Sequence, residues 1–137
     1  MAGYSGTPLL KKLGIQEGGR VLLRNAPAVL PEELREYAGT RPGKNLDVAL
    51  FFVDSVATLN AGLDPLLKVI KSDGMIWIAW PKKASGIQTD LTENLIRDRV
   101  LQTPLVDIKI CAIDETWSGL KFVIRKEHRA ALAAHAN

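Results

Sequence analysis

The chain has 137 residues, of which 47% are hydrophobic and 24% are charged, and its formal net charge is +3 at pH 7. This length predicts one domain, and the composition is ordinary for a soluble globular protein. No apolar run approaches the roughly 18–20 residues that a membrane span needs. The start of the chain shows no secretory signal, so we expect a cytoplasmic protein with no membrane partner.

Metal ions and nucleic acids are not expected as ligands. Cys111 is the single cysteine, which excludes an intramolecular disulfide and a zinc site built from several thiolates. The two histidines, His128 and His135, both lie near the carboxyl terminus. The basic excess is only a few residues, whereas proteins that bind nucleic acids usually carry a denser basic stripe.

The first third of the chain alternates helix and strand signals. The pair Thr7–Pro8 predicts the N-cap and first position of a short helix, and Gly14 predicts its end. Residues 20–27, "RVLLRNAP", predict a short strand that ends at the proline. Residues 31–39, "PEELREYAG", then predict a helix that a proline opens and a glycine closes.

Two continuous apolar runs follow, at residues 46–55, "LDVALFFVDS", and residues 75–81, "MIWIAWP". Such runs predict strands covered on both faces, as in parallel sheets. Between them, leucines at helical spacing predict a helix. Gly62 and Pro65 interrupt this pattern, so we expect a kink or a restart there.

The next helix is predicted to begin with a capping pair, Asp90 as N-cap and Glu93 at the third helical position, and to extend to about Leu101. Asp90 would then occupy the helix terminus at which an anion could otherwise sit.

The last part of the chain predicts a hairpin at or near a sheet edge. Residues 106–114, "VDIKICAID", alternate so that Val106, Ile108 and Ile110 share one face, with Asp107 and Lys109 on the other. Residues 120–126, "LKFVIRK", alternate similarly, and the loop "ETWSG" joins the two segments.

The predicted fold class is therefore α/β: a three-layer sandwich with a mainly parallel sheet that ends in an antiparallel hairpin. We expect a single domain over residues 1–127 and a mobile tail over residues 128–137.

In open parallel sheets, ligands bind in the crevice beyond the carboxyl ends of the strands. Polar residues follow each predicted strand, and we expect them to meet at this edge, although loops at strand ends are polar in any case. The candidate ligand-binding residues are Asn25, Asp54 with its neighbour Ser55, Lys82, Lys83, Asp114, Glu115, Trp117 and Ser118.

Each of these residues also has a purely structural interpretation. Lys82 and Lys83 could hold a phosphate or carboxylate, or could be solvated or paired with acidic residues of the hairpin loop. Trp117 could be a stacking platform or lid, or could pack the hairpin loop onto the sheet. Trp77 and Trp80 lie on a buried strand, and Trp80, at the strand end, is the one expected to border a pocket.

Three segments carry a resemblance to a known family: "GYSGTPLLKKLG" at the start, "WPKKASG" with "TDLTE", and "VDIKICAIDETWSGLKFVIR". With these, the chain resembles a bacterial family of uncharacterised small proteins, known as a domain of unknown function. The family implies no reaction.

At the level of the fold, the chain is similar to class I S-adenosylmethionine-dependent methyltransferases, whose sheet also ends in an antiparallel hairpin. It resembles a truncated form of them. Methyltransferases carry an acidic, glycine-rich loop after the first strand, where this chain reads "RNAPAVLP". Their next strand is short or missing here, between Tyr37 and Leu46. We therefore expect no cofactor and argue against S-adenosylmethionine.

The leading hypothesis is a non-catalytic ligand-binding or interaction module on a degenerate methyltransferase-like scaffold. The alternative is an enzyme that acts on an anionic small molecule, with Lys82 or Lys83 neutralising charge and Asp114 or Glu115 as general base. A weaker alternative is RNA held at the same edge, with Trp117 stacking on a base.

Overall fold

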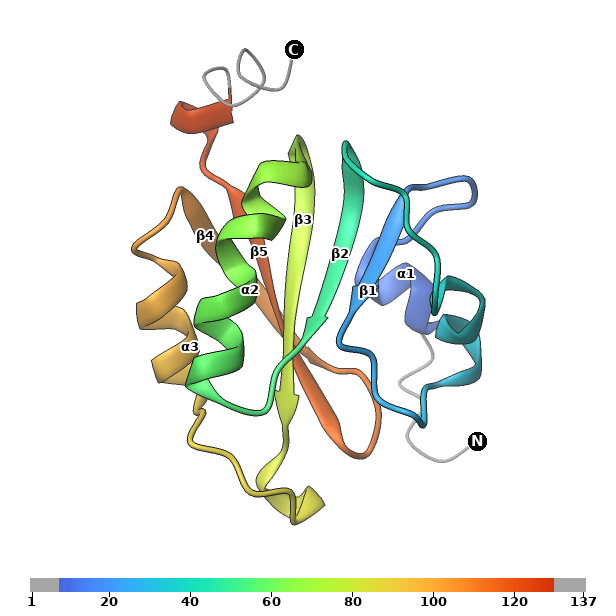
Figure 1. The fold of residues 1–137 in the computed structure, drawn as a ribbon, viewed down its shortest axis with the longest axis vertical. Helices are drawn as coiled ribbons and strands as arrows, with labels where there is room; N and C mark the ends of the chain where they lie inside the picture. The colour runs from blue at the N-terminus through green and yellow to red at the C-terminus, as the bar shows by residue number, and fades with distance from the viewer. Residues whose placement is uncertain (1–7, 130–137) are drawn as a thin grey trace.

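A computed structural model describes residues 8–129 (Figure 1). Thr7, predicted as a helix cap, lies outside the described residues. So does the predicted tail from residue 130 onward, while residues 126–129 are helical. Within the described part, no helix combines the length and apolar character needed to cross a membrane. The elements in chain order are α1 (Leu9–Leu13), β1 (Val21–Arg24), the 3-10 helix η1 (Glu32–Tyr37), β2 (Leu46–Phe52), α2 (Val56–Val69), β3 (Ile70–Pro81), the 3-10 helix η2 (Lys83–Ser85), α3 (Glu93–Val100), β4 (Leu105–Ala112) and β5 (Trp117–Ile124).

The five strands form one sheet in the order β1-β2-β3-β5-β4. Neighbours β1, β2 and β3 are parallel, while β5 is antiparallel to both β3 and β4. Strand β4 therefore runs in the same direction as β1 to β3, and only β5 is reversed. This arrangement confirms the predicted α/β fold with a mainly parallel sheet ending in an antiparallel hairpin. The loop over residues 38–45 carries no strand, as the sequence indicated.

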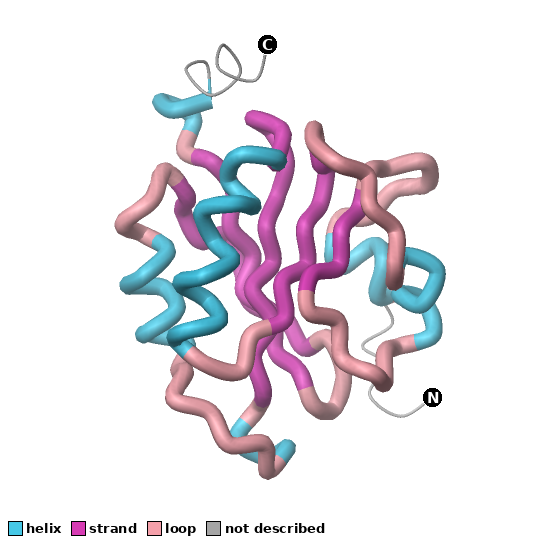
Figure 2. The backbone as a smooth tube through the Cα atoms, viewed as in Figure 1, coloured by secondary structure: helices cyan, strands magenta, loops and turns pink. Residues whose placement is uncertain are grey.

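Helices cover the two faces of this sheet unequally (Figure 2). Helices α2 and α3 pack on one face, where their buried side chains form a single apolar cluster with β2, β3 and β5. On the other face α1 and η1 build a second cluster with β1, β2 and β3. The indole Nε1 of Trp77 donates a 2.9 Å hydrogen bond to the carbonyl of Leu13, which ties α1 to the middle of the sheet.

Helix α2 is one continuous helix through both Gly62 and Pro65, so the prediction of a restart was wrong. Gly62 is buried and faces the ring of Phe51 on β2. A Cβ atom at position 62 would lie only 2.3 Å from the Phe51 Cζ atom. The glycine that interrupts the helical pattern therefore allows α2 to approach the Phe51 ring of the sheet closely.

The predicted alternation in the first hairpin strand was partly wrong. The register shifts between Asp107 and Lys109, so a bulge separates them. Asp107 lies opposite Phe122 on the α3 side, where its carboxylate accepts a 3.0 Å hydrogen bond from Arg97. Ile108 and Ile110 are 53% and 48% exposed instead of packing into the core.

Candidate functional site

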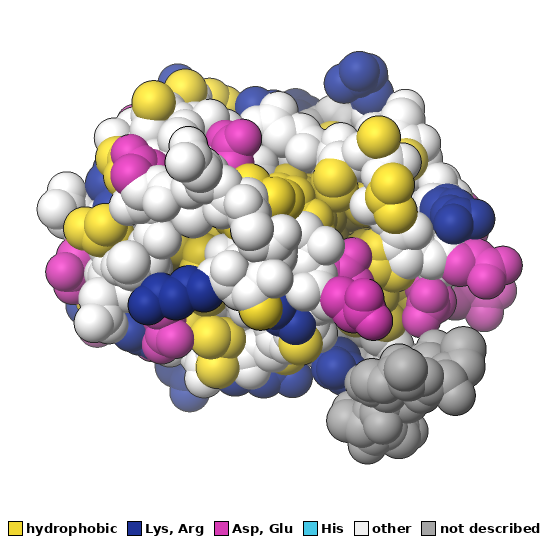
Figure 3. All heavy atoms as spheres, turned by 90° about the horizontal axis from the view of Figure 1, so that it is seen from below, with side chains coloured by type: hydrophobic (Ala, Val, Ile, Leu, Met, Phe, Trp, Pro, Cys, Tyr) yellow, Lys and Arg dark blue, Asp and Glu magenta, His cyan; other side chains and the backbone are white. Residues whose placement is uncertain are grey.

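A cleft of ≈ 960 Å³ opens at the carboxyl edge of the sheet, between the ends of β2 and β3. Viewed onto this edge, apolar surface lies recessed between acidic and basic side chains (Figure 3). The lining residues come from the two strand ends and from the loop that leads into α3: Asp54, Ser55, Trp80, Pro81, Lys83, Gly86, Ile87, Gln88, Thr89, Asp90, Leu91, Thr92 and Glu93.

Trp80 and Leu91 provide much of the buried apolar lining of the cleft, being 8% and 5% exposed. Trp80 is the second-last residue of β3, where Ser118 of β5 lies directly opposite it. The expectation that Trp80, and not Trp77, borders a pocket is thus met, since Trp77 is fully buried beneath α1. Ser118 is half-buried beside the cleft but does not line it.

The loop wall is held by a hydrogen bond that the sequence did not predict. Asp90 does not cap α3: the N-cap of α3 is Thr92, whose hydroxyl accepts from the backbone N–H of Leu95 at 3.1 Å. The carboxylate of Asp90 instead accepts from the backbone N–H of Val56, in the first turn of α2, at 2.9 Å. The predicted capping pair of Asp90 and Glu93 was therefore wrong.

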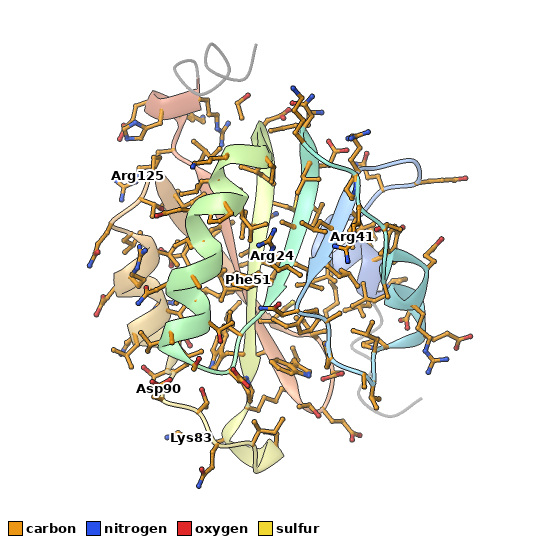
Figure 4. All side chains as sticks on the ribbon, viewed as in Figure 1. Arg24, Arg41, Phe51, Lys83, Asp90 and Arg125 are labelled. Atoms are coloured by element: carbon orange, nitrogen blue, oxygen red, sulfur yellow. The ribbon has the colours of Figure 1, made fainter. Side chains whose placement is uncertain are left out.

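Local geometry at the end of β3 separates the two predicted lysines. The backbone N–H of Lys82 donates to the carbonyl of Thr116 at 2.8 Å, which joins this strand end to the hairpin loop. The single turn η2 follows, and Gly86 ends it with φ 78°, a conformation that favours glycine. As a result Lys83 lines the cleft and Lys82 does not (Figure 4 labels Lys83 and Asp90).

Carboxylates outnumber cationic groups around the cleft. Among residues 8–129, Asp54, Asp90 and Glu93 line it against the single cation Lys83. Glu93 is paired with Arg97 of the same helix at 2.5 Å, and Asp90 is engaged by Val56. Within residues 8–129, neither Asp54 nor Lys83 forms an ion pair, so these two charges are available to a ligand.

The hairpin-loop candidates have structural roles on the other side of the sheet. One Asp114 carboxylate oxygen accepts from the backbone N–H groups of Thr116 and Trp117, both at 2.8 Å. Trp117 is 9% exposed and packs edge-on against Phe52, with ring centroids 5.1 Å apart. It belongs to the cluster beneath α1 and η1, so it packs the loop onto the sheet and is no lid over the cleft.

The remaining candidates lie on the surface near the same edge. Asn25 is exposed and has a left-handed backbone with φ 57°, which turns the chain sharply after β1. Glu115 is exposed at the tip of the hairpin loop. Neither residue lines the cleft.

The described side chains of the cleft do not form the acid–base pair that the enzyme hypothesis required. Lys83 lines the cleft, whereas Asp114 and Glu115 do not. The hydroxyl of Ser55 accepts from the Thr58 backbone N–H and is 2.9 Å from the Thr58 hydroxyl, so it serves as the N-cap of α2. Among residues 8–129, no group of three His, Cys, Asp or Glu side chains is arranged to hold a metal ion.

No family model and no curated protein matches the chain. Solved structures do match: LepI in complex with SAM, at TM-score 0.51, and a variant of LepI in complex with SAH and a substrate analogue, at TM-score 0.53. Each shares 12% sequence identity, and the match covers 85% of this chain and 39% of the other. At this identity the likeness establishes the fold, and the chain spans about two fifths of the length of these proteins.

These neighbours correct the prediction about S-adenosylmethionine. We argued against this cofactor because the loop after the first strand lacks glycines. Structures with the same overall fold are complexes with SAM and with SAH, which contradicts that prediction.

Proposed function

We propose that the chain is a small-molecule-binding module without a catalytic reaction of its own. Its cleft between the ends of β2 and β3 would take a ligand of the S-adenosylmethionine type. The observation that carries this proposal is the placement of the free carboxylate of Asp54 and the indole of Trp80 in one open cleft at the carboxyl edge. Ligands of open α/β sheets bind at this edge.

The charge of the cleft favours a cationic ligand over an anionic one. The N-terminus of α2 is the place in the cleft where an anion would bind. The carboxylate of Asp90 already accepts a hydrogen bond there, from the backbone N–H of Val56 in the first turn of α2. Asp54 remains unpaired within the described residues and attracts positive charge. An indole such as that of Trp80 also attracts cations, so a sulfonium group suits this lining.

The fold supports the choice of ligand class. The two LepI structures that share it are complexes with SAM and SAH. Membership of the bacterial family that the sequence resembles is part of the same proposal, as is the absence of catalysis. Asp54 and Lys83, neither of which forms an ion pair within the described residues, could orient a bound ligand. No nucleophile with an adjacent base lines the cleft among the described residues.

Calorimetric titration with SAM and with SAH tests the proposal. We expect SAM to bind more tightly than SAH, because SAH lacks the sulfonium charge. Asp54→Asn should weaken SAM binding by about tenfold, the equivalent of about 1.4 kcal/mol for one charge-assisted contact. Asp64→Asn, which removes an exposed carboxylate further along α2, is the matched control and should leave the affinity unchanged.

Three outcomes would contradict this proposed function. The ligand class is wrong if neither compound binds at millimolar concentration, or if the Asp54 and Asp64 variants behave alike. The non-catalytic part is wrong if the protein converts SAM to SAH over hours with transfer of the methyl group to water or to the protein itself, as followed by mass spectrometry.

A further inference from the structure

A basic surface lies on the sheet face that carries α1, over the half formed by β4 and β5. Lys109 and Lys121 are directly opposite each other across these two strands. Lys12 of α1 lies close enough to act electrostatically on Cys111 of β4, as does Lys109. We call Lys12, Lys109 and Lys121, with the half-buried Met75, Cys111 and Val123 beside them, the lysine face.

The lysines of this face are not offset by nearby carboxylates. The pKa of Lys121 is lowered, first by burial and then by the positive charge of Lys109. Burial raises the pKa of the Cys111 thiol, while Lys12 and Lys109 act in the opposite direction. No acidic residue contributes to either shift, and within residues 8–129 none of the three lysines forms an ion pair.

Apolar side chains lie on both sides of the Lys109–Lys121 pair: Cys111 on one side, and Val123 with Met75 on the other. Met75, Cys111 and Val123 are each half-buried, with Met75 directly opposite Val123 across β3 and β5. The ammonium of Lys109 lies 6.0 Å from the centre of the Trp77 ring, so its aliphatic stem runs along the sheet. The face therefore offers positive charge and apolar area together.

On the opposite face of the sheet, the same strands are covered by helices. There, α2 and α3 pack on β3 and β5 (Figure 1). On the lysine face, the apolar cluster of α1 and η1 takes in β1 to β3 and the turn end of the hairpin, through Ile113 and Trp117, and Met75 and Cys111 pack at its edge. Within the described residues, no helix covers Lys109, Lys121 and Val123 on this side.

We propose that the lysine face docks an acidic amphipathic helix of a partner protein. Apolar side chains of such a helix would cover the exposed parts of Met75, Cys111 and Val123, and its carboxylates would meet the three lysines. A nucleic-acid backbone would supply the charge but no apolar stripe, and it usually meets a denser set of cations than three lysines. This inference is independent of the cleft, which lies on the α2 side of the sheet.

A synthetic peptide provides the test. The probe is a fluorescein-labelled helical peptide with a leucine stripe flanked by glutamates, and its control has the same composition in an order that is not amphipathic. Fluorescence anisotropy should show that Lys109→Glu weakens binding of the amphipathic peptide by about tenfold or more. Lys68→Glu makes the same charge change at an exposed position of α2 and should have no such effect. Unchanged thermal melting of both variants shows that they are folded.

The single cysteine reports where the peptide lies. Bound peptide should slow alkylation of Cys111 in the wild-type protein and have no effect on it in Lys109→Glu. The proposal is overturned if the control peptide binds as tightly, if Lys68→Glu weakens binding equally, or if Cys111 stays unprotected. It is also overturned if a single-stranded oligonucleotide binds more tightly than the amphipathic peptide and depends on Lys109. Failure here leaves SAM binding at the cleft unaffected, so the two proposals fail separately.

Discussion

The carboxylate of Asp90 accepts a hydrogen bond from the backbone N–H of Val56 at 2.9 Å, across 34 residues of sequence. It fastens the loop wall of the cleft to the first turn of α2. Ser55 caps the same helix through the N–H of Thr58, so two protein oxygens already serve this helix end. The cleft consequently presents a helix terminus whose attraction for anions is largely used by the protein itself.

Replacing Asp90 by alanine should therefore have two effects. The free energy of unfolding should fall by about 1 kcal/mol, the usual cost of losing a helix cap. Sulfate should then stabilise the variant more than the wild type, because an anion can occupy the vacated place. Urea denaturation with and without sulfate measures both effects. Asp98→Ala, at an exposed position of α3, is the control. Equal sulfate effects in both variants would contradict the role assigned to Asp90.

The error over Asp90 shows which features the sequence can specify. Strands β2 and β3 were predictable because their apolar runs need cover on both faces, which few other structures provide. A capping pattern depends only on residues close in sequence, and several nearby residues can fit it. Here the N-cap of α3 is Thr92, two residues after Asp90. The true partner of Asp90 is distant in sequence, so no spacing rule could reveal it. The cleft depends on this contact, which explains why its loop wall was missed.

Gly62 marks a second contact that sequence patterns did not reveal. Gly62→Ala should destabilise the protein by about 1–3 kcal/mol, because its Cβ would collide with the Phe51 ring. This is opposite to the gain of up to about 1 kcal/mol expected for the same change in an exposed helix. Urea unfolding of Gly62→Ala, Phe51→Leu and the double variant provides the check. The smaller leucine should relieve the collision, so the double variant should lose less stability than the two single losses added together. If the stability losses of the two single variants simply add in the double variant, the loss in Gly62→Ala does not come from a collision with the Phe51 ring.

Asp47 should make stability depend on acidic pH. Its carboxylate accepts from the backbone N–H of Arg20 at 2.8 Å and from the ammonium of Lys71 at 3.0 Å. The hydrogen bond from Arg20 is the main cause that lowers the pKa of Asp47 below its ordinary value of 3.8, and Lys71 adds to it against partial burial. The stabilisation is fully present above that ordinary value and is lost as the pH falls through the lowered pKa of the folded state.

The variant Asp47→Asn should consequently be less stable than the wild type at neutral pH, and the difference should shrink below about pH 4. Urea unfolding across this pH range measures it. Asp98→Asn, at an exposed position of α3, should show no comparable pH dependence. A constant difference between Asp47→Asn and the wild type at all pH values would rule out the contribution assigned to the carboxylate charge.

A substitution of Trp117 tests whether this residue packs the hairpin loop or takes part in ligand binding. Its ring meets Phe52 edge-on at an interplanar angle of 89°, in the cluster beneath α1, whereas Trp80 lies on the cleft side. Trp117→Phe should lower the free energy of unfolding by about 1–2 kcal/mol, since the smaller ring leaves part of the site empty. The affinity for SAM should stay within about twofold of the wild type, a change of less than about 0.5 kcal/mol. Trp80→Phe is the comparison, because it removes indole surface from the cleft lining. If Trp117→Phe reduced SAM affinity as much as Trp80→Phe does, the hairpin tryptophan would belong to the binding site after all.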